Sequence, residues 1–425
     1  MIRRLFLLPL LACALLAPLP GAPPAKAAEG FDAARLARLA QVMQGFVDRK
    51  ELPGMVLQVD RKGRPVTRLA LGCQDVAGSR PMATDTIFRI ASMSKPVTSV
   101  AVLILWEEGR LRLDDPLSKF IPEFKGVQVG TPGKAGEEPQ LSGTTREITI
   151  RDLLTHRSGL SYGFNGDGPI QEAYHKLGVT DGLDAAAFDL AENMARLAKA
   201  PLAHDPGKAF HYGLSTDVLG RVVEVVSGQS LEAFFQARIF RPLRMQDSSF
   251  ILPPEKASRL AEVATGAEGG GLRLMKDPES FGRVHLSPVE GYRPGRHYLS
   301  GGAGLLSTAA DYARFLGMLV NRGSLDGARI LSPKTVELMT TSHTRDLPAT
   351  NGRDFGLGVS VLVDLGASRQ LGSPGNFGWS GLYGTFFWVD PRSRLVAVLM
   401  TQRFPYGGVD WMGTFQTQVY QALVE

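Results

Sequence analysis

The chain has 425 residues, of which 44% are apolar, 21% charged and 8% aromatic. These values are typical of a globular protein and exclude a disordered, collagen-like or coiled-coil chain. The length allows one large mixed domain or two domains, with a core that needs no disulfides. The formal charge is +5 without a basic cluster, so we expect no nucleic-acid partner.

The first 27 residues have the pattern of a secretory signal peptide. Arg3 and Arg4 precede the apolar run Leu5–Leu16, and Ala25-Lys26-Ala27 fits a cleavage site that would leave Ala28 first. The run is too short for a spanning helix, so we expect no stable membrane insertion after cleavage and a periplasmic or secreted protein. An uncleaved anchor and a lipoprotein attached through Cys13 are alternatives.

One cysteine, Cys73, would remain in the mature chain. A single cysteine cannot form an internal disulfide, and Cys73 follows a strand-like stretch. We therefore expect it to be a small buried apolar residue and not a nucleophile.

Apolar periodicity predicts strands near both ends of the mature chain and helices between them. In chain order, the expected elements are a helix (29–48), a strand hairpin (54–60 and 65–72), a short strand (86–91), a buried helix (95–108) with Gly109 after its last turn, a long loop (124–147), a mainly helical stretch (148–244), a stretch of unclear periodicity (252–298), helices with serine N-caps (307–322 and 332–341), strands (355–365, 381–390 and 395–401) and a final helix (411–424).

This order predicts an α/β (α+β) fold with one antiparallel sheet, flanked by the N- and C-terminal helices, and an inserted all-helical lobe. The predicted boundaries are 28–105 and 290–425 for the sheet domain and 106–289 for the lobe. A cleft between two such parts is a common place for a small-molecule site.

The candidate nucleophile is Ser92, in the tetrad Ser92-Met93-Ser94-Lys95. At a helix start, residues three apart lie on the same side, so the amine of Lys95 could take the serine proton. Burial at the base of an apolar helix favours a neutral amine, and the positive helix end favours an alkoxide. On its own the tetrad could equally be a capped helix start.

The surrounding sequence resembles the serine β-lactamases and penicillin-binding proteins. The segment 88–124 around the tetrad is similar to their first signature, and 148–160 and 206–228 are similar to the next two blocks. The segments 300–315 and 378–390 then follow in the order typical of that family. The resemblance implies a β-lactamase/transpeptidase-like fold.

Two departures from the family pattern bear on the substrate. Trp379-Ser380-Gly381 stands where β-lactamases usually have Lys-Thr-Gly, and Leu214 replaces the asparagine of Tyr-x-Asn in Tyr212-Gly213-Leu214. β-Lactam recognition uses the cation and the amide that are missing here. The chain is more similar to the carboxylesterases with a class C β-lactamase fold and to the related acyltransferases.

The resemblance implies a role for each site residue. Ser92 would attack the ester carbonyl, while Lys95 and Tyr212, the latter with a lowered pKa, would share the proton transfers. The backbone N–H groups of Ser92 and Leu382 would form the oxyanion hole.

Four further residues would contact the substrate: Trp379, Ser380, Gly381 and Leu214. Tyr212 and Trp379 could alternatively be packing aromatics. No cofactor and no metal are implied.

Weaker signals compete with this interpretation. The stretch Gly159–Gly163 fits G-x-S-x-G around Ser161, but an α/β-hydrolase elbow needs a strand before the serine, and this stretch follows a predicted helix. The seven histidines show no H-x-x-x-H spacing, and the glycines at 301–304 lack the lysine of a phosphate loop.

Three hypotheses follow. The favoured one is an exported serine esterase that acts on small esters with short to medium acyl groups. The second is a β-lactamase, D-aminopeptidase or D,D-peptidase, or an acyltransferase of the same fold. The third is a non-catalytic penicillin-binding module. The sequence does not indicate an oligomeric state.

Overall fold

The computed structural model describes residues 28–131, 133–134, 136–348 and 350–424. The predicted signal peptide, residues 1–27, lies outside the described residues, as does Cys13. Within the described part, no helix combines the length and the apolar character needed to span a bilayer.

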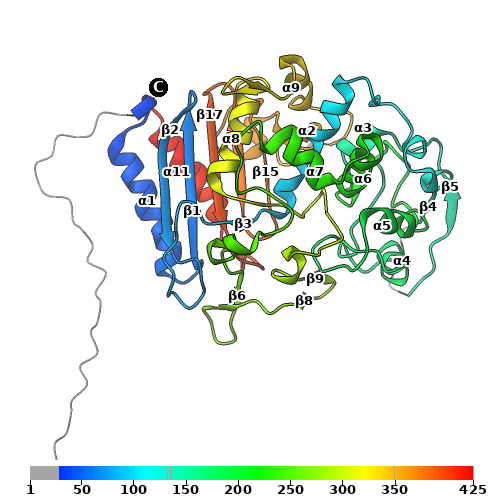
Figure 1. Cartoon of the computed structure of the whole chain (residues 1–425), viewed down its shortest axis with the longest axis horizontal. Helices are drawn as coiled ribbons and strands as arrows, with labels where there is room; N and C mark the ends of the chain where they lie inside the picture. The colour runs from blue at the N-terminus through cyan, green and yellow to red at the C-terminus, as the bar shows by residue number, and fades with distance from the viewer. Residues whose placement is uncertain (1–27, 132, 135, 349, 425) are drawn as a thin grey trace, which may run out of the picture.

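A seven-stranded antiparallel sheet carries the fold, with the strand order β13-β14-β15-β16-β17-β1-β2 (Figure 1). The strands are β1 (Gly54–Arg61), β2 (Arg64–Gly72), β13 (Arg353–Phe355), β14 (Ser360–Leu362), β15 (Phe377–Ser380), β16 (Phe386–Asp390) and β17 (Leu395–Thr401). Strands from the N- and C-terminal parts of the described chain meet where β1 pairs with β17, with Leu57 opposite Leu399. The predicted single antiparallel sheet is confirmed.

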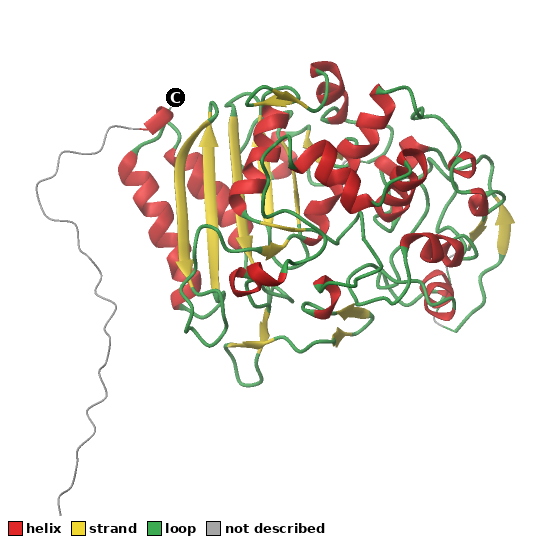
Figure 2. Ribbon diagram, in the orientation of Figure 1, coloured by secondary structure: helices red, strands yellow, loops and turns green. Residues whose placement is uncertain are grey.

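Both faces of the sheet are covered by helices, because β17 is apolar on both sides (Figure 2). Leu395, Ala397 and Leu399 pack with α1 (Ala33–Asp48) and α11 (Trp411–Ala422). The alternate residues Val396, Val398 and Met400 belong to the larger core with α2 (Ser94–Glu107) and α8 (Ala309–Val320). The predicted flanking by N- and C-terminal helices is confirmed.

The remaining elements surround this frame, most of them in the part of the chain between α2 and α8. The helices are α3 (Ile150–Leu154), α4 (Pro169–Lys176), α5 (Leu190–Leu197), α6 (Ser215–Ser227), α7 (Leu231–Phe235), α9 (Pro333–Met339) and α10 (Leu365–Ser368). The short strands are β3 (Phe88–Arg89), β4 (Gln128–Gly130), β5 (Leu141–Gly143), β6 (Ala264–Gly266), β7 (Leu272–Leu274), β8 (Glu279–Phe281), β9 (Val284–Leu286), β10 (Leu306–Ser307), β11 (Ser324–Leu325) and β12 (Ala328–Arg329).

The prediction of an all-helical lobe is wrong. The hairpins β4–β5, β6–β7 and β8–β9 lie in it, each built from three-residue strands that are too short to give an alternating apolar signal. The lobe is therefore mainly helical with small hairpins. The domain boundaries themselves stay a prediction.

Three predicted elements also differ from the structure. The expected strand at 355–365 is the hairpin β13–β14, because Gly358 has a φ of 89° and turns the chain. The expected strand at 381–390 begins only at Phe386, after a turn that follows β15. The N-cap of α8 is Thr308 and not Ser307, which pairs in β10.

Cys73 was predicted to be buried, but its side chain is half-buried beyond the end of β2.

Candidate active site

Ser92 and Lys95 lie together at the start of α2. Ser92 is in the short 3-10 helix Ala91–Met93, and Lys95 is the second residue of α2, whose side chains are buried through Leu105. Lys95 is fully buried, and its Nζ lies 3.2 Å from Ser92 Oγ. Ala91 has a φ of 42°, in the left-handed region that a non-glycine residue rarely adopts. Such local strain is common beside reactive groups.

The amine of Lys95 has two further hydrogen-bond partners. Its Nζ lies 2.9 Å from Tyr162 Oη and 2.9 Å from the carbonyl oxygen of Gly302. Three partners match the three protons of an ammonium group, so these hydrogen bonds offset much of the free energy that the buried amine loses on leaving water. A Cβ on Gly302 would lie 2.4 Å from Asp217 Oδ2, so only glycine brings this carbonyl so close.

Tyr162, a hydrogen-bond partner of Lys95, is a site residue that sequence reasoning missed. It lies in the loop after α3, only 3% exposed, and its ring is stacked on Phe164. Burial raises the pKa of Tyr162 well above its usual value, so the phenol stays protonated. Its one sequence signal is its place in Gly159–Gly163, directly after the family-like block 148–160, and that stretch is interpreted above only as a serine motif around Ser161.

Tyr212 lies in the same site but makes a different contact. Lys95 Nζ lies 4.6 Å from the centre of the Tyr212 ring, a cation–π contact. The Tyr212 hydroxyl accepts a hydrogen bond from Trp379 Nε1 at 3.1 Å. The indole therefore fixes the phenol, which leaves the Tyr212 proton free to be donated.

A cavity of about 200 Å³ opens over Ser92. Its described lining contains five of the predicted residues besides Ser92, namely Tyr212, Trp379, Ser380, Gly381 and Leu382, and it adds Tyr162, Phe164, Asp181, Leu183, Ala303 and Tyr406. The backbone N–H of Leu382 has no acceptor among the described residues. An N–H without a partner beside a reactive serine can stabilise an oxyanion.

Leu214 does not line this cavity. Its side chain is fully buried in the main core, where it precedes the first turn of α6. The prediction that Leu214 contacts substrate is therefore wrong. The residue lies two positions after Tyr212, but the chain enters a helix there and turns the side chain inward.

Three titratable groups with shifted pKa values surround the site. Burial, and then the charge of Lys95, lowers the pKa of His156 well below its usual value, so this ring is neutral against Tyr212. Burial raises the pKa of Asp217, although the charge of Lys95 opposes this shift. Burial likewise raises the pKa of Asp181 to about 7, although a hydrogen bond from the Gly163 N–H opposes this shift.

The alternative nucleophile Ser161 is placed differently. It is fully buried in the loop between α3 and α4, and its Oγ lies 2.9 Å from His211 Nε2 and 3.1 Å from Gln171 Nε2. No strand precedes it directly, so the elbow of an α/β-hydrolase is absent from this part of the described chain. Among the described residues, no three His, Cys, Asp or Glu side chains form a group that could hold a metal ion.

Comparison with known proteins agrees with this fold. The Beta-lactamase family profile matches residues 39–417. The esterase EstB of Burkholderia gladioli is 36% identical over 381 residues, which cover 87% of this chain and 91% of EstB.

Two solved structures are also similar. EstCE1, described as a hydrolase with promiscuous acyltransferase activity, has a TM-score of 0.78 at 29% identity and covers 92% of this chain and 99% of its own. A mutant of simvastatin synthase from Aspergillus terreus has a TM-score of 0.75 at 25% identity and covers 93% of this chain and 98% of its own. This chain therefore belongs to the Beta-lactamase family and has the β-lactamase/transpeptidase-like fold.

Proposed function

We propose that this protein hydrolyses carboxylic esters through a covalent acyl group on Ser92. The observation that carries the proposal is the buried contact of Lys95 Nζ with Ser92 Oγ, beneath a small cavity. The relatives EstB and EstCE1, named an esterase and a hydrolase, support an ester-hydrolysing enzyme of this fold.

In the proposed reaction, Ser92 Oγ bonds to the ester carbonyl carbon as its proton passes to Lys95 Nζ. The N–H groups of Ser92 and Leu382 hold the oxyanion. As the intermediate collapses, the C–O bond to the alcohol breaks and the alcohol takes a proton from Lys95 or Tyr212. Water then attacks the acyl carbon and gives a proton to Lys95 or Tyr212. The C–O bond to Ser92 breaks, Ser92 Oγ takes that proton back, and the acid is released.

The small size of the cavity supports short acyl groups. At about 200 Å³, with Phe164, Leu183 and Leu382 in its wall, it has room for a chain of few carbons. Trp379 stands at the position of the family's cationic third-motif residue. The cation that binds the carboxylate of a β-lactam is therefore missing at that position, which favours an ester over a β-lactam as the substrate.

The test is turnover of p-nitrophenyl acetate and butyrate by the wild type, Ser92→Ala and Ser161→Ala. We expect Ser92→Ala to abolish turnover and fluorophosphonate labelling, whereas Ser161→Ala keeps labelling at Ser92. Unchanged turnover in Ser92→Ala would contradict the proposal. Rapid nitrocefin hydrolysis with poor ester turnover would instead favour the β-lactam-directed alternative.

Acyl transfer is a second candidate, supported by the transferase activity named for EstCE1 and by the likeness to simvastatin synthase. An alcohol could then replace water at the acyl-serine. Addition of a primary alcohol to the p-nitrophenyl acetate assay distinguishes the two: a transferase forms the new ester in preference to acetate.

We also propose export directed by residues 1–27, with the mature chain beginning at Ala28. The support is the sequence pattern alone. N-terminal sequencing of the protein from a periplasmic or culture fraction should give Ala28; a cytoplasmic protein that keeps its first residues would contradict export.

A further inference from the structure

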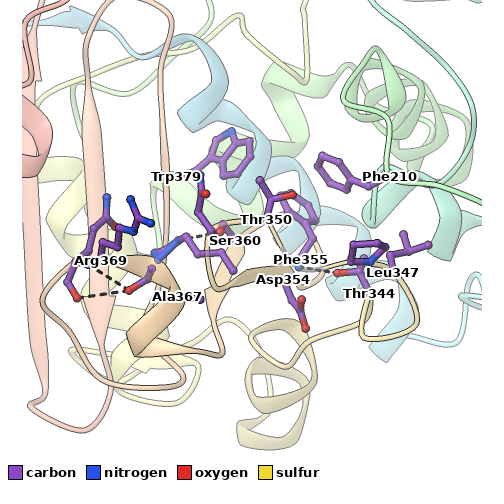
Figure 3. Close-up of a pocket in the computed structure, with 15 residues that line it drawn as sticks. Phe210, Thr344, Leu347, Thr350, Asp354, Phe355, Ser360, Ala367, Arg369 and Trp379 are labelled. Carbon is purple, nitrogen blue, oxygen red and sulfur yellow. Dashed lines mark hydrogen bonds between the residues drawn. The ribbon is translucent and has the colours of Figure 1, made fainter.

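A second, larger cavity shares Trp379 with the cavity over Ser92. Its volume is about 740 Å³. Figure 3 shows Trp379, Phe355 and Phe210 around it. The Phe355 ring centre lies 5.2 Å from those of both Trp379 and Phe210, so an aromatic wall leads from the reactive serine into this space.

Arg353, on β13, lines this cavity without a counter-ion. Its Nε donates to Ser360 Oγ at 3.2 Å, but its Nη1 is inaccessible to water and has no hydrogen-bond partner. Ser360 pairs with Gly378, the residue before Trp379, so the guanidinium lies near the wall shared with the catalytic cavity.

A second arginine, Arg369, lies on the exposed rim of the same cavity. No carboxylate among the described residues forms an ion pair with Arg353 or Arg369. Asp354 also lines the cavity, but it is buried and accepts a hydrogen bond from the Ser342 hydroxyl at 2.5 Å.

A guanidinium that is partly withdrawn from water and has no counter-ion costs free energy. An anion in the cavity would offset part of this cost by accepting a charge-assisted hydrogen bond from the other terminal nitrogen, Nη2. A volume of about 740 Å³ lies within the usual range of small-molecule sites.

We propose that this cavity holds the alcohol portion of the ester and that Arg353, with Arg369, binds a carboxylate on it. The inference rests on the proposed esterase function and names its substrate class: small acyl esters of alcohols that carry a carboxylate. The division follows from the two volumes, because about 200 Å³ over Ser92 suits a short acyl group and about 740 Å³ suits the larger alcohol portion.

The test compares 4-acetoxyphenylacetate with 4-acetoxyphenylacetamide, in which a neutral primary amide replaces the carboxylate and the acetyl ester and leaving phenol are kept. We expect the wild type to prefer the anionic ester in kcat/KM, mainly through a lower KM. Arg353→Gln should lower the ratio of anionic to neutral kcat/KM by about tenfold or more, the loss of one charge-assisted contact. Arg369→Gln should lower it by a smaller factor.

The control is Arg392→Gln, an identical charge change at an exposed residue outside the cavity lining, which should keep the wild-type ratio. A wild-type ratio near one, or the same ratio in Arg353→Gln as in the wild type, overturns the inference. Because Arg369 is exposed, its variant tests the site even if Arg353→Gln does not fold. Hydrolysis of p-nitrophenyl acetate by Ser92 is measured separately, so failure of the esterase proposal is recognised on its own.

Discussion

The hydroxyl of Tyr162 offers the sharpest test of how Lys95 works. The variant Tyr162→Phe removes one of the three partners of Lys95 Nζ, the hydroxyl at 2.9 Å, and keeps the ring that stacks on Phe164. A hydrogen bond from a charged donor is worth roughly 1.5–3 kcal/mol, against about 0.5–1.5 kcal/mol for a neutral pair.

Only the difference between these two values affects the chemical step, because the bond exists before and after Lys95 takes the Ser92 proton. That difference is about 1–1.5 kcal/mol, so we expect kcat to fall about 5- to 13-fold. The assay is steady-state hydrolysis of p-nitrophenyl acetate, with Tyr212→Phe measured in parallel.

The result would refute this reasoning if kcat of Tyr162→Phe stayed within about twofold of the wild type while Tyr212→Phe lost activity. Lys95 would then exchange its proton through Tyr212, and the contact with Tyr162 would only support the fold. Thermal unfolding of both variants separates a catalytic loss from a loss of folded protein.

Three other changes give distinct outcomes. Gly302→Ala places a Cβ 2.4 Å from Asp217 Oδ2, so it should displace the carbonyl bound to Lys95 and lower kcat roughly 10- to 100-fold; unchanged kinetics would contradict this. Leu214→Ala should destabilise the fold by about 2–5 kcal/mol in urea unfolding, with fluorophosphonate labelling of Ser92 retained; lost labelling in folded protein would restore Leu214 to the site. Since burial raises the pKa of Asp181 from 3.8 to about 7, the folded state holds this proton longer than the unfolded chain, and stability falls as pH rises through that interval. Asp181→Asn should therefore have a higher Tm than the wild type at about pH 8, a gain that shrinks toward about pH 4; an equal difference at both pH values would contradict it.

The sheet was predictable from the sequence because its strands carry strong local signals. The run at 395–401 is apolar on both faces, and β17 has the predicted bounds Leu395–Thr401. The region 252–298 carries no such signal, because the strands of its hairpins are only three residues long. These hairpins take their shape from contacts with distant segments, such as the bridge between Ala264 and Arg403.

The site was predictable only where its residues are neighbours in the sequence. Ser92 and Lys95 are one helical turn apart, so their contact follows from spacing. The contact of Lys95 with Tyr162 joins residues 67 apart, and that with Gly302 joins residues 207 apart. No periodicity encodes such pairs. Leu214 is an error of the opposite kind, a residue wrongly included in the site. Its position in the motif predicted a substrate contact, but it lies directly before α6 and its side chain is buried in the core.

The partners of Lys95 suit an amine that gains and loses a proton within one turnover. The Gly302 carbonyl can only accept, so it always holds one N–H of Lys95. The hydroxyls of Ser92 and Tyr162 can donate or accept, so both can accept from an ammonium, whereas Ser92 can donate its proton to a neutral amine. No contact has to break when the proton moves, and the buried amine is never left without partners. This arrangement requires that Tyr162 stay a neutral phenol, which is the effect of its burial.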